Sequence, residues 1–139
     1  MSALVAQREL LSVEEFKRAH HAVSELARTL EAVDVLERKD FVALGSLVTQ
    51  SHVSLRDDYE VSCPELNCAV DVALARGALG ARMVGGGFGG SAIALAEQGQ
   101  IQEIKSAIAD AFKSAQYAEP RFFTALPSKG AQLIKKLDR

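Results

Sequence analysis

Six consecutive positions near the middle of the chain, Gly85-Gly86-Gly87-Phe88-Gly89-Gly90, could do chemistry without a reactive side chain. Five of the six lack a β-carbon, so the backbone there can reach positive φ and another group can approach it closely. Main-chain N–H groups exposed in this way can face an anion such as a phosphate. The same composition also suits a sharp turn, and the residues alone leave both interpretations open.

Gly85, Gly87 and Gly90 formally match the Gly-x-Gly-x-x-Gly pattern of dinucleotide-binding proteins. That pattern opens a helix, whereas residues 91–96 read as a strand and the chain has no alternating βαβ order. A Walker loop is excluded because no Lys-Ser or Lys-Thr follows the glycines. We therefore do not interpret the glycines as a complete nucleotide-binding motif.

The three histidines and Ser91 are weak catalytic candidates. His20, His21 and His52 have no carboxylate or cysteine partner at a metal-ligand spacing, and we interpret them as surface or helix-face residues. Ser91 lacks the Gly-x-Ser-x-Gly setting of a nucleophile, because Ala-Ile-Ala follows it. The sequence therefore predicts no nucleophile and no base.

Paired acidic residues and two cysteines complete the set of reactive groups. Asp57 and Asp58 could hold Mg²⁺, but adjacent carboxylates are more typical of a solvated turn or of partners for Arg56. Cys63 and Cys68 lie five residues apart in an expected helix, where their side chains point in different directions, so we expect free thiols. No metal site is predicted.

The composition bounds the class of protein. A chain of 139 residues suffices for one domain with an ordinary core. With 16 basic and 18 acidic side chains, its net charge of −2 creates no field that would attract nucleic acid or an anionic membrane. The sequence has no apolar run long enough to span a bilayer. Its first residues also lack the basic-then-apolar order of a secretory signal. We expect a cytoplasmic protein that binds neither nucleic acid nor membrane.

Hydrophobic spacing predicts two long helices in the first half of the chain. Ser12 and Glu15 fit a capping box that starts an amphipathic helix ending near Arg38, and Asp40 then caps a second helix. Residues 51–66 are less regular and predict a polar connection. The apolar stripe of the first helix is Val13, Phe16, Val23, Leu26, Leu30 and Val33, and the buried stripe of the second is Phe41, Leu44, Leu47, Val48 and Leu55.

The second half mixes helices and strands. Ser62 with Glu65, and Pro64 in the first turn, start a third helix that ends at Gly77. Residues 81–84 and 91–96 predict an antiparallel hairpin around the glycines, residues 101–115 a helix, and residues 121–126 a third strand. This order predicts an α+β fold, an antiparallel sheet with helices on one face, in which the first strand of a ferredoxin-like unit is missing.

Three stretches together resemble a known family. They are Ser51-His-Val-Ser-Leu-Arg-Asp-Asp-Tyr-Glu-Val-Ser-Cys-Pro-Glu-Leu66, then Gly77-Ala-Leu-Gly-Ala-Arg-Met-Val-Gly-Gly-Gly-Phe-Gly-Gly90, and Glu119-Pro-Arg-Phe-Phe-Thr124. In these stretches the chain resembles the C-terminal domain of galactokinases, within the GHMP small-molecule kinase superfamily. The resemblance predicts a lead-in at 1–11, a ferredoxin-like GHMP kinase C-terminal domain at 12–130 and a loosely held tail at 131–139.

The resemblance implies transfer of the γ-phosphoryl group of ATP, with Mg²⁺, to the anomeric hydroxyl of galactose. In the family the N-terminal domain supplies the catalytic Asp and Arg and the main phosphate-binding loop, none of which this chain contains. It therefore implies cofactor binding by residues 85–90, no catalytic or metal residue here, and inactivity without an N-terminal domain or a separate N-terminal half. The alternative is a non-catalytic regulatory or structural module derived from a galactokinase; sugar binding by this domain alone is disfavoured.

The chain departs from the family pattern at two positions, and the resemblance predicts one exposed surface. Val84 stands where the family usually has Thr, which removes a hydroxyl beside the glycines, and Ser91 stands where it commonly has the nearly isosteric Cys. We expect an exposed apolar surface where the partner domain belongs, around Met83, Phe88 and the open sheet edge. Such a surface predicts self-association of the isolated chain.

Overall fold

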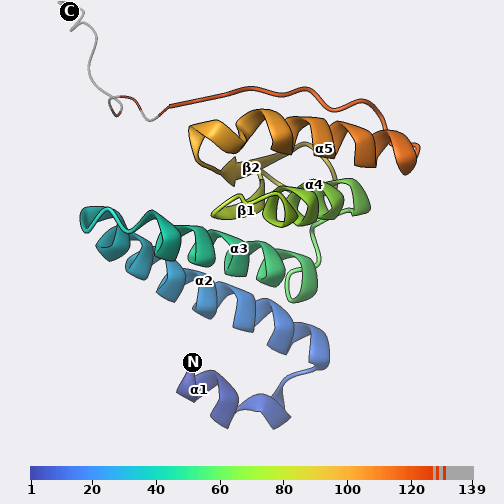
Figure 1. Cartoon of the computed structure of the whole chain (residues 1–139). Helices are drawn as coiled ribbons and strands as arrows, with labels where there is room; N and C mark the ends of the chain where they lie inside the picture. Colours follow the sequence, from blue (N-terminus) through green and yellow to red (C-terminus); the bar gives the residue numbers. More distant parts are fainter. Residues whose placement is uncertain (127, 129, 131–139) are drawn as a thin grey trace, which may run out of the picture.

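The computed structural model describes residues 1–126, 128 and 130. Figure 1 shows α3 lying between α2 and the β1–β2 hairpin, with α4 and α5 on the far side of α3. Among the described residues, no helix is long and apolar enough to cross a bilayer. The elements are α1 (Ser2–Ala6), the 3-10 turn η1 (Arg8–Leu10), α2 (Val13–Glu37), α3 (Phe41–Asp57), α4 (Pro64–Ala75), β1 (Gly80–Val84), β2 (Ser91–Leu95), the 3-10 turn η2 (Gln98–Gln100) and α5 (Ile101–Ser114).

The helix starts follow the predicted capping, with one exception. Ser12 and Glu15 form the complete capping box of α2, and the carboxylate of Asp40 accepts the backbone N–H of Ala43 at 3.0 Å. Pro64 opens α4 as expected, but Cys63 rather than Ser62 is its N-cap residue. The predicted Ser62 cap is wrong because the Ser62 hydroxyl donates instead to the side chain of Asn67, at 2.7 Å.

The antiparallel hairpin is confirmed, and with it the α+β class. β1 pairs with β2 from Gly80 opposite Leu95 to Val84 opposite Ser91. Ala81 and Met83 are fully buried, because α3 and α4 both pack on β1. Met83 packs with Leu55 and Leu66, while a second cluster joins α4 and α5 through Val70, Ala73, Ala81, Ile104, Ile108 and Phe112.

The prediction of an exposed surface around Met83 is therefore wrong for that residue. Its side chain is 0% exposed, because it shares with Ala81 the face of β1 that the helices cover. Phe88, by contrast, is 77% exposed, and Ile93 on β2 is 54% exposed. The open apolar surface lies on the glycine turn and on β2.

The expected polar connection begins later than predicted. Residues 51–57 continue α3 as a regular helix, in which Ser51, His52 and Ser54 are buried. The interpretation failed because these polar groups find hydrogen-bond partners on α2 and β1, which makes their burial tolerable. The connection between α3 and α4 is confined to residues 58–63.

The predicted third strand at residues 121–126 is also wrong. The described part of the chain contains a two-stranded sheet, and these residues have no ladder partner. Figure 1 shows the segment running back along α5, and the Lys105 ammonium donates to the Thr124 hydroxyl at 2.9 Å. A strand needs a neighbour for its N–H and C=O groups, and this segment lies beside a helix. The predicted tail at 131–139 lies outside the described residues.

The apolar stripe of α2 is not buried. Leu26 and Leu30 are both 64% exposed. Phe41, which was expected in the buried stripe of the next helix, is also 49% exposed at the start of α3. The polar side of α2 faces α3 instead, because the His21 imidazole and the Glu25 carboxylate pair there with the hydroxyl groups of Ser54 and Ser51. The periodicity identified the two faces correctly but not which of them the fold covers.

Candidate functional site

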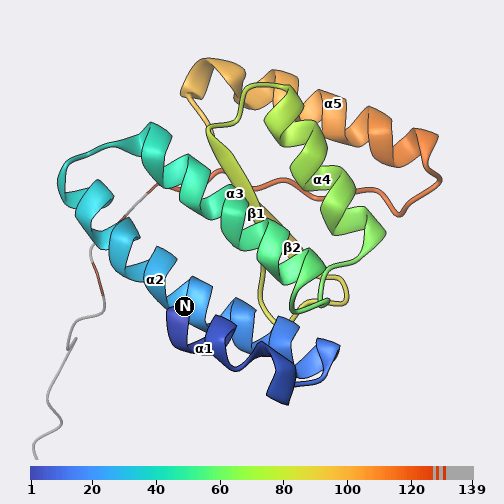
Figure 2. The same cartoon turned by 90° about the horizontal axis from the view of Figure 1, so that it is seen from below.

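The glycine run forms the turn that joins β1 to β2. Figure 2 shows this turn beside the connection between α3 and α4. Five of its six residues have positive φ: Gly85 at 94°, Gly87 at 85°, Phe88 at 59°, Gly89 at 128° and Gly90 at 94°. Residues that carry a side chain rarely adopt positive φ, so the path of the turn requires glycines.

One glycine is also required by a close contact. A β-carbon on Gly87 would lie 2.2 Å from the carbonyl oxygen of Val61, which also accepts the N–H of Phe88 at 2.7 Å. A β-carbon on Gly85, Gly86, Gly89 or Gly90 would have no atom within 4 Å. Val61 therefore anchors the turn at its centre, while the rest of the turn faces open space.

The backbone of the turn offers unused donors. Among the described residues, the N–H of Phe88 is the one N–H group of residues 85–90 that has a hydrogen-bond acceptor in the protein. Successive N–H groups in left-handed conformations make a concavity suited to an anion. Residues 80–96 contain no acidic side chain, and Arg82 is their one charged residue. The hairpin itself therefore places no negative charge beside the turn.

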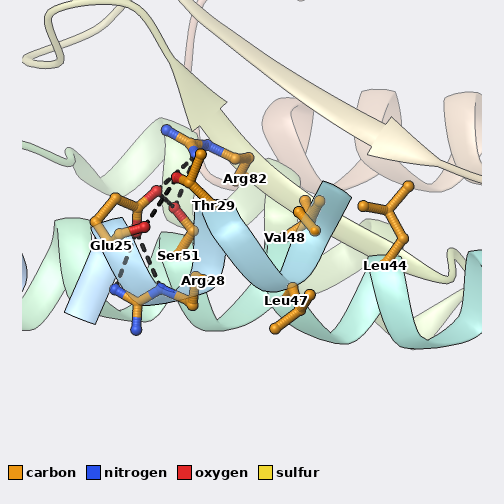
Figure 3. Close-up of a pocket in the computed structure, with 9 residues that line it drawn as sticks. Glu25, Arg28, Thr29, Leu44, Leu47, Val48, Ser51 and Arg82 are labelled. Atoms are coloured by element: carbon orange, nitrogen blue, oxygen red, sulfur yellow. Dashed lines mark hydrogen bonds and ion pairs between the residues drawn. The ribbon is translucent and has the colours of Figure 1, made fainter. Parts of the chain in front are cut away.

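A polar network holds β1 against both long helices. The Arg82 guanidinium donates to the Ser51 hydroxyl at 2.7 Å and contacts the Glu25 carboxylate at 3.1 Å, while the Ser51 hydroxyl donates to Glu25 at 2.6 Å. Arg28 pairs with the other oxygen of Glu25 at 2.9 Å. Figure 3 shows these side chains converging from α2, α3 and β1. The network ties the strand that leads into the glycine turn to the helical layer.

A cavity of about 130 Å³ adjoins this network. Its other wall is apolar and includes Leu44, Leu47 and Val48 (Figure 3). Burial opposes ionisation of Glu25, but the hydrogen bonds from Ser51 and Arg28 outweigh it and lower the pKa of this carboxyl. Glu25 is thus a carboxylate paired within the protein, suited to positioning rather than to proton transfer.

The histidines are structural. His52 was interpreted as a surface or helix-face residue; it lies on a buried face of α3 with its side chain 1% exposed, so the surface position is wrong. Its Nδ1 accepts the backbone N–H of Met83 at 3.3 Å. Burial lowers the pKa of His52, and burial likewise lowers the pKa of His21, whose Nδ1 lies 3.0 Å from the Ser54 hydroxyl. His20 lies on the helix face as expected, with Nδ1 at 2.9 Å from Asp58.

The acidic pair does not form a metal site in the described part of the chain. Asp57 pairs with Arg56 at 2.7 Å, and Asp58 accepts from Ser54 at 2.8 Å. Among the described residues, no group of three or more His, Cys, Asp or Glu side chains could hold a metal ion. Ser91 is exposed opposite Val84 at the end of the hairpin, and Cys63 and Cys68 are free thiols as expected.

Sequence reasoning missed the network of Glu25, Ser51 and Arg82. Its residues are 26 and 31 positions apart along the chain, and no local spacing joins them. One signal was available, since Arg82 interrupts the apolar run Ala81-Arg-Met-Val84. A charge inside a strand that is otherwise apolar requires a partner.

The sequence is similar to a known family and to several known proteins. Residues 15–114 match the family described as GHMP kinases C terminal. A galactokinase from Streptomyces coelicolor is 50% identical over 122 residues, which cover 87% of this chain and 32% of that protein. Human galactokinase is 53% identical over 98 residues, which cover 70% of this chain and 25% of that protein. The chain thus spans about a third or less of the length of these relatives.

Solved structures give the same result for the fold. The crystal structure of Lactococcus lactis galactokinase complexed with galactose superposes with a TM-score of 0.79 at 36% identity, covering 83% of this chain and 30% of that chain. The structure of L. major mevalonate kinase in complex with R-mevalonate matches with a TM-score of 0.52 at 34% identity, covering 63% of this chain and 26% of that chain. Both likenesses support the expected architecture.

Proposed function

The chain belongs to the GHMP kinase family as a C-terminal domain, and from this premise we propose that it is the C-terminal part of a galactokinase. In this proposal the complete enzyme transfers the γ-phosphoryl group of ATP to the anomeric hydroxyl of galactose. The observation that carries it is the open glycine turn: the β-carbon positions of Gly85, Gly86, Gly89 and Gly90 have no atom within 4 Å, and Phe88 has the one N–H of residues 85–90 with an acceptor among the described residues. We keep residues 12–130 as the proposed bounds of the domain.

The turn fits one part of the cofactor. Backbone N–H groups of residues 85–87 and 89–90 can donate to phosphate oxygens, and the missing β-carbons let a phosphate-bearing partner approach the chain closely. Bound ATP supplies the phosphoryl group and its leaving group. These donors stabilise the negative charge of the phosphates and orient them, which is the main protein contribution to phosphoryl transfer.

Mg²⁺ does not fit the described residues of this chain. Mg²⁺ prefers carboxylate and phosphate oxygens, and no suitable carboxylate cluster is present among those residues. Residues 80–96 also supply no carboxylate or histidine as a general base, since Arg82 is their one charged residue. We therefore propose that the base and the metal ligands come from an N-terminal half and that this chain alone is inactive.

Reconstitution tests this proposal. The purified chain is mixed with the N-terminal part of the Streptomyces coelicolor galactokinase, and galactose-dependent ADP release is measured. We expect turnover in the mixture and none from either part alone. Turnover by the chain alone, or none from a mixture shown to form a complex, would contradict the proposal.

A charge placed on the turn provides a matched variant. Gly86 has no neighbour within 4 Å of its β-carbon position and no positive φ, so Gly86→Asp should fold normally. Its carboxylate would repel the phosphates, and we expect turnover in the mixture to fall at least about tenfold, with Gly86→Asn much less affected. Equal effects of Asp and Asn would argue against an anion at the turn.

The alternative is a non-catalytic module that binds an N-terminal partner. It is favoured by Val84, which stands beside the turn without a hydroxyl group, and by the missing base and metal ligands among the described residues. Complex formation without turnover in the same mixture would favour this alternative.

A further inference from the structure

One edge of β1 is covered by a helix instead of a strand. Within the described residues the one strand neighbour of β1 is β2, so the N–H groups on its other edge need acceptors of another kind. The Ala81 N–H donates to the Thr49 hydroxyl at 3.4 Å. The Met83 N–H donates to Nδ1 of His52 at 3.3 Å. Because Thr49 and His52 are three residues apart on α3, they share one face of the helix, which takes the place of a strand along this edge.

The two acceptors on α3 respond differently to acid. The Thr49 hydroxyl donates to the carbonyl oxygen of Gly45 at 3.0 Å, which leaves its lone pairs available to the Ala81 N–H at any pH. Nδ1 of His52 can accept a hydrogen bond only while it carries no proton. Since Nδ1 accepts from Met83, the proton of the neutral ring belongs on Nε2. The contact with His52 is therefore the one along this edge that protonation can break.

The ring of His52 is enclosed by the protein. Its side chain is 1% exposed, and its Nε2 is buried without a hydrogen-bond partner among the described residues. The bond from Met83 thus fixes the ring from one side only. At a site this deeply buried, solvent does not replace a lost partner. Loss of the bond must therefore be accommodated by movement of the ring or of the strand.

The bond between His52 and Met83 lies next to the glycine turn. Met83 stands two positions before the turn begins. α3 also holds the centre of the turn, because the Val61 carbonyl accepts the Phe88 N–H at 2.7 Å and the Val61 N–H donates to the carbonyl oxygen of Leu55 at 3.0 Å. The C-terminal half of one helix therefore fixes both the entry to the turn and its centre.

We propose that His52 is a positioning residue for the glycine turn, which it holds in place through the Met83 N–H while Nδ1 is unprotonated and releases when the ring takes up a proton from solvent. Protonation places a donor on Nδ1 opposite the donor of Met83, so the two groups must separate. The turn is free to move, because four of its glycines have no atom within 4 Å of their β-carbon positions. The consequence for phosphate binding rests on the proposed function, whereas the coupling between His52 and the turn does not.

The charges around His52 oppose its protonation until the pH is low. Burial and the positive charges of Arg56 and Arg82 lower the pKa of His52, while Asp71 and the side chain of Asn67 act in the opposite direction. The release therefore belongs to acid conditions below the ordinary histidine range. The charged groups that act on His52 are Arg56 and Asp57 on α3, Asp71 on α4 and Arg82 on β1.

NMR spectroscopy of the 139-residue chain tests the coupling without any measurement of activity. The pH is lowered from roughly 7.5 to 5 while the signals of the His52 ring and of the backbone amides are followed. We expect the amides of Met83 and of residues 85–90 to shift with the same midpoint as the His52 ring, at a pH below 6.5. His21→Asn is the control, because His21 contacts Ser54 rather than β1 and its loss should leave this titration unchanged.

Two replacements of His52 separate the role of Nδ1 from that of the ring as a whole. Asn places its amide at the δ position, where Nδ1 lies, and Gln places its amide at the ε position. At neutral pH we expect His52→Asn to retain the hydrogen-exchange protection of the Met83 and Phe88 amides and to abolish their response to acid. In His52→Gln these amides should exchange at least about tenfold faster, with the amides of α5 unchanged. If His52→Gln does not fold, the acid response of His52→Asn decides alone.

Four outcomes would overturn the positioning role. They are turn amides that do not follow the His52 ring, turn amides that still titrate in His52→Asn, equal exchange in the Asn and Gln variants, and loss of all amide signals together as the pH falls. The last result would mean that His52 controls the whole domain rather than the turn. Turnover in the reconstituted mixture is a separate measurement. If the coupling is found and a mixture that forms a complex shows no turnover, the proposed kinase function fails and the role of His52 stands.

Discussion

Gly45 on α3 and Gly80 at the start of β1 lie in direct backbone contact. A β-carbon on Gly80 would come 2.1 Å from the carbonyl oxygen of Gly45, and one on Gly45 would come 2.1 Å from the carbonyl oxygen of Leu79. The helix and the strand therefore approach each other more closely than any side chain allows. Since β1 leads into the glycine turn, this contact sets the position of the turn relative to α3.

Replacing Gly80 by Ala should be strongly destabilising. The new methyl group would overlap backbone atoms that cannot move aside, so we expect the free energy of unfolding to fall by more than about 2 kcal/mol. Urea denaturation measures the change. Gly99→Ala is the control, because no atom lies within 4 Å of its β-carbon position. Equal losses in the two variants would contradict the contact.

Gly87→Ala should destabilise the chain more than Gly86→Ala. Gly87 has a φ of +85° and lies against Val61, whereas Gly86 has neither constraint. We expect Gly87→Ala to cost about 1–3 kcal/mol of unfolding free energy and Gly86→Ala less than about 1 kcal/mol. The two variants are compared by the same urea titration. If Gly86→Ala were the more damaging, the anchoring of the turn at Val61 would be wrong.

Removal of the Arg82 charge should weaken the attachment of β1 to the helices. Arg82→Met leaves Glu25 and Ser51 without their strand partner in a partly buried site, and we expect a loss of about 1–3 kcal/mol in unfolding free energy. Arg76→Met is the matched control, since Arg76 pairs with Glu103 at 3.6 Å on the open surface. This control should change stability by less than about 0.5 kcal/mol.

Stability should fall as the pH is lowered from neutrality through the ordinary histidine range. Burial lowers the folded-state pKa of both His21 and His52 below the usual 6.5. The unfolded chain therefore takes up protons first as the pH falls, so stability is fully present above pH 6.5 and decreases below it. Urea midpoints measured between roughly pH 5.5 and 7.5 follow the effect.

His52→Asn isolates one contribution to this pH dependence. The amide oxygen of Asn can accept the Met83 N–H as Nδ1 does, but it does not titrate. We expect a flatter pH profile than in the parent chain, even if the variant is less stable at every pH. An unchanged slope would show that His52 does not contribute.

Local signals predicted the helix starts and the hairpin. The capping box at Ser12 and Glu15, Pro64 at the first turn of α4 and the glycines between two short apolar runs act through neighbouring backbone groups, so they could be interpreted without the fold. The burial of His52 could not be predicted from local signals, because its partner Met83 is 31 residues away along the chain. The third strand was predicted wrongly for the same reason, since residues 121–126 have a strand-like composition but no ladder neighbour.

The sequence by itself determined which backbone positions can turn and which residues share a face. It therefore predicted the glycine turn at 85–90 and separated the apolar and polar sides of α2. Only the tertiary structure decided that the polar side of α2 is covered and that Arg82 reaches Glu25 and Ser51. The physical reason is that periodicity depends on the geometry of one helix, whereas burial depends on which distant groups satisfy each other's hydrogen bonds and charges.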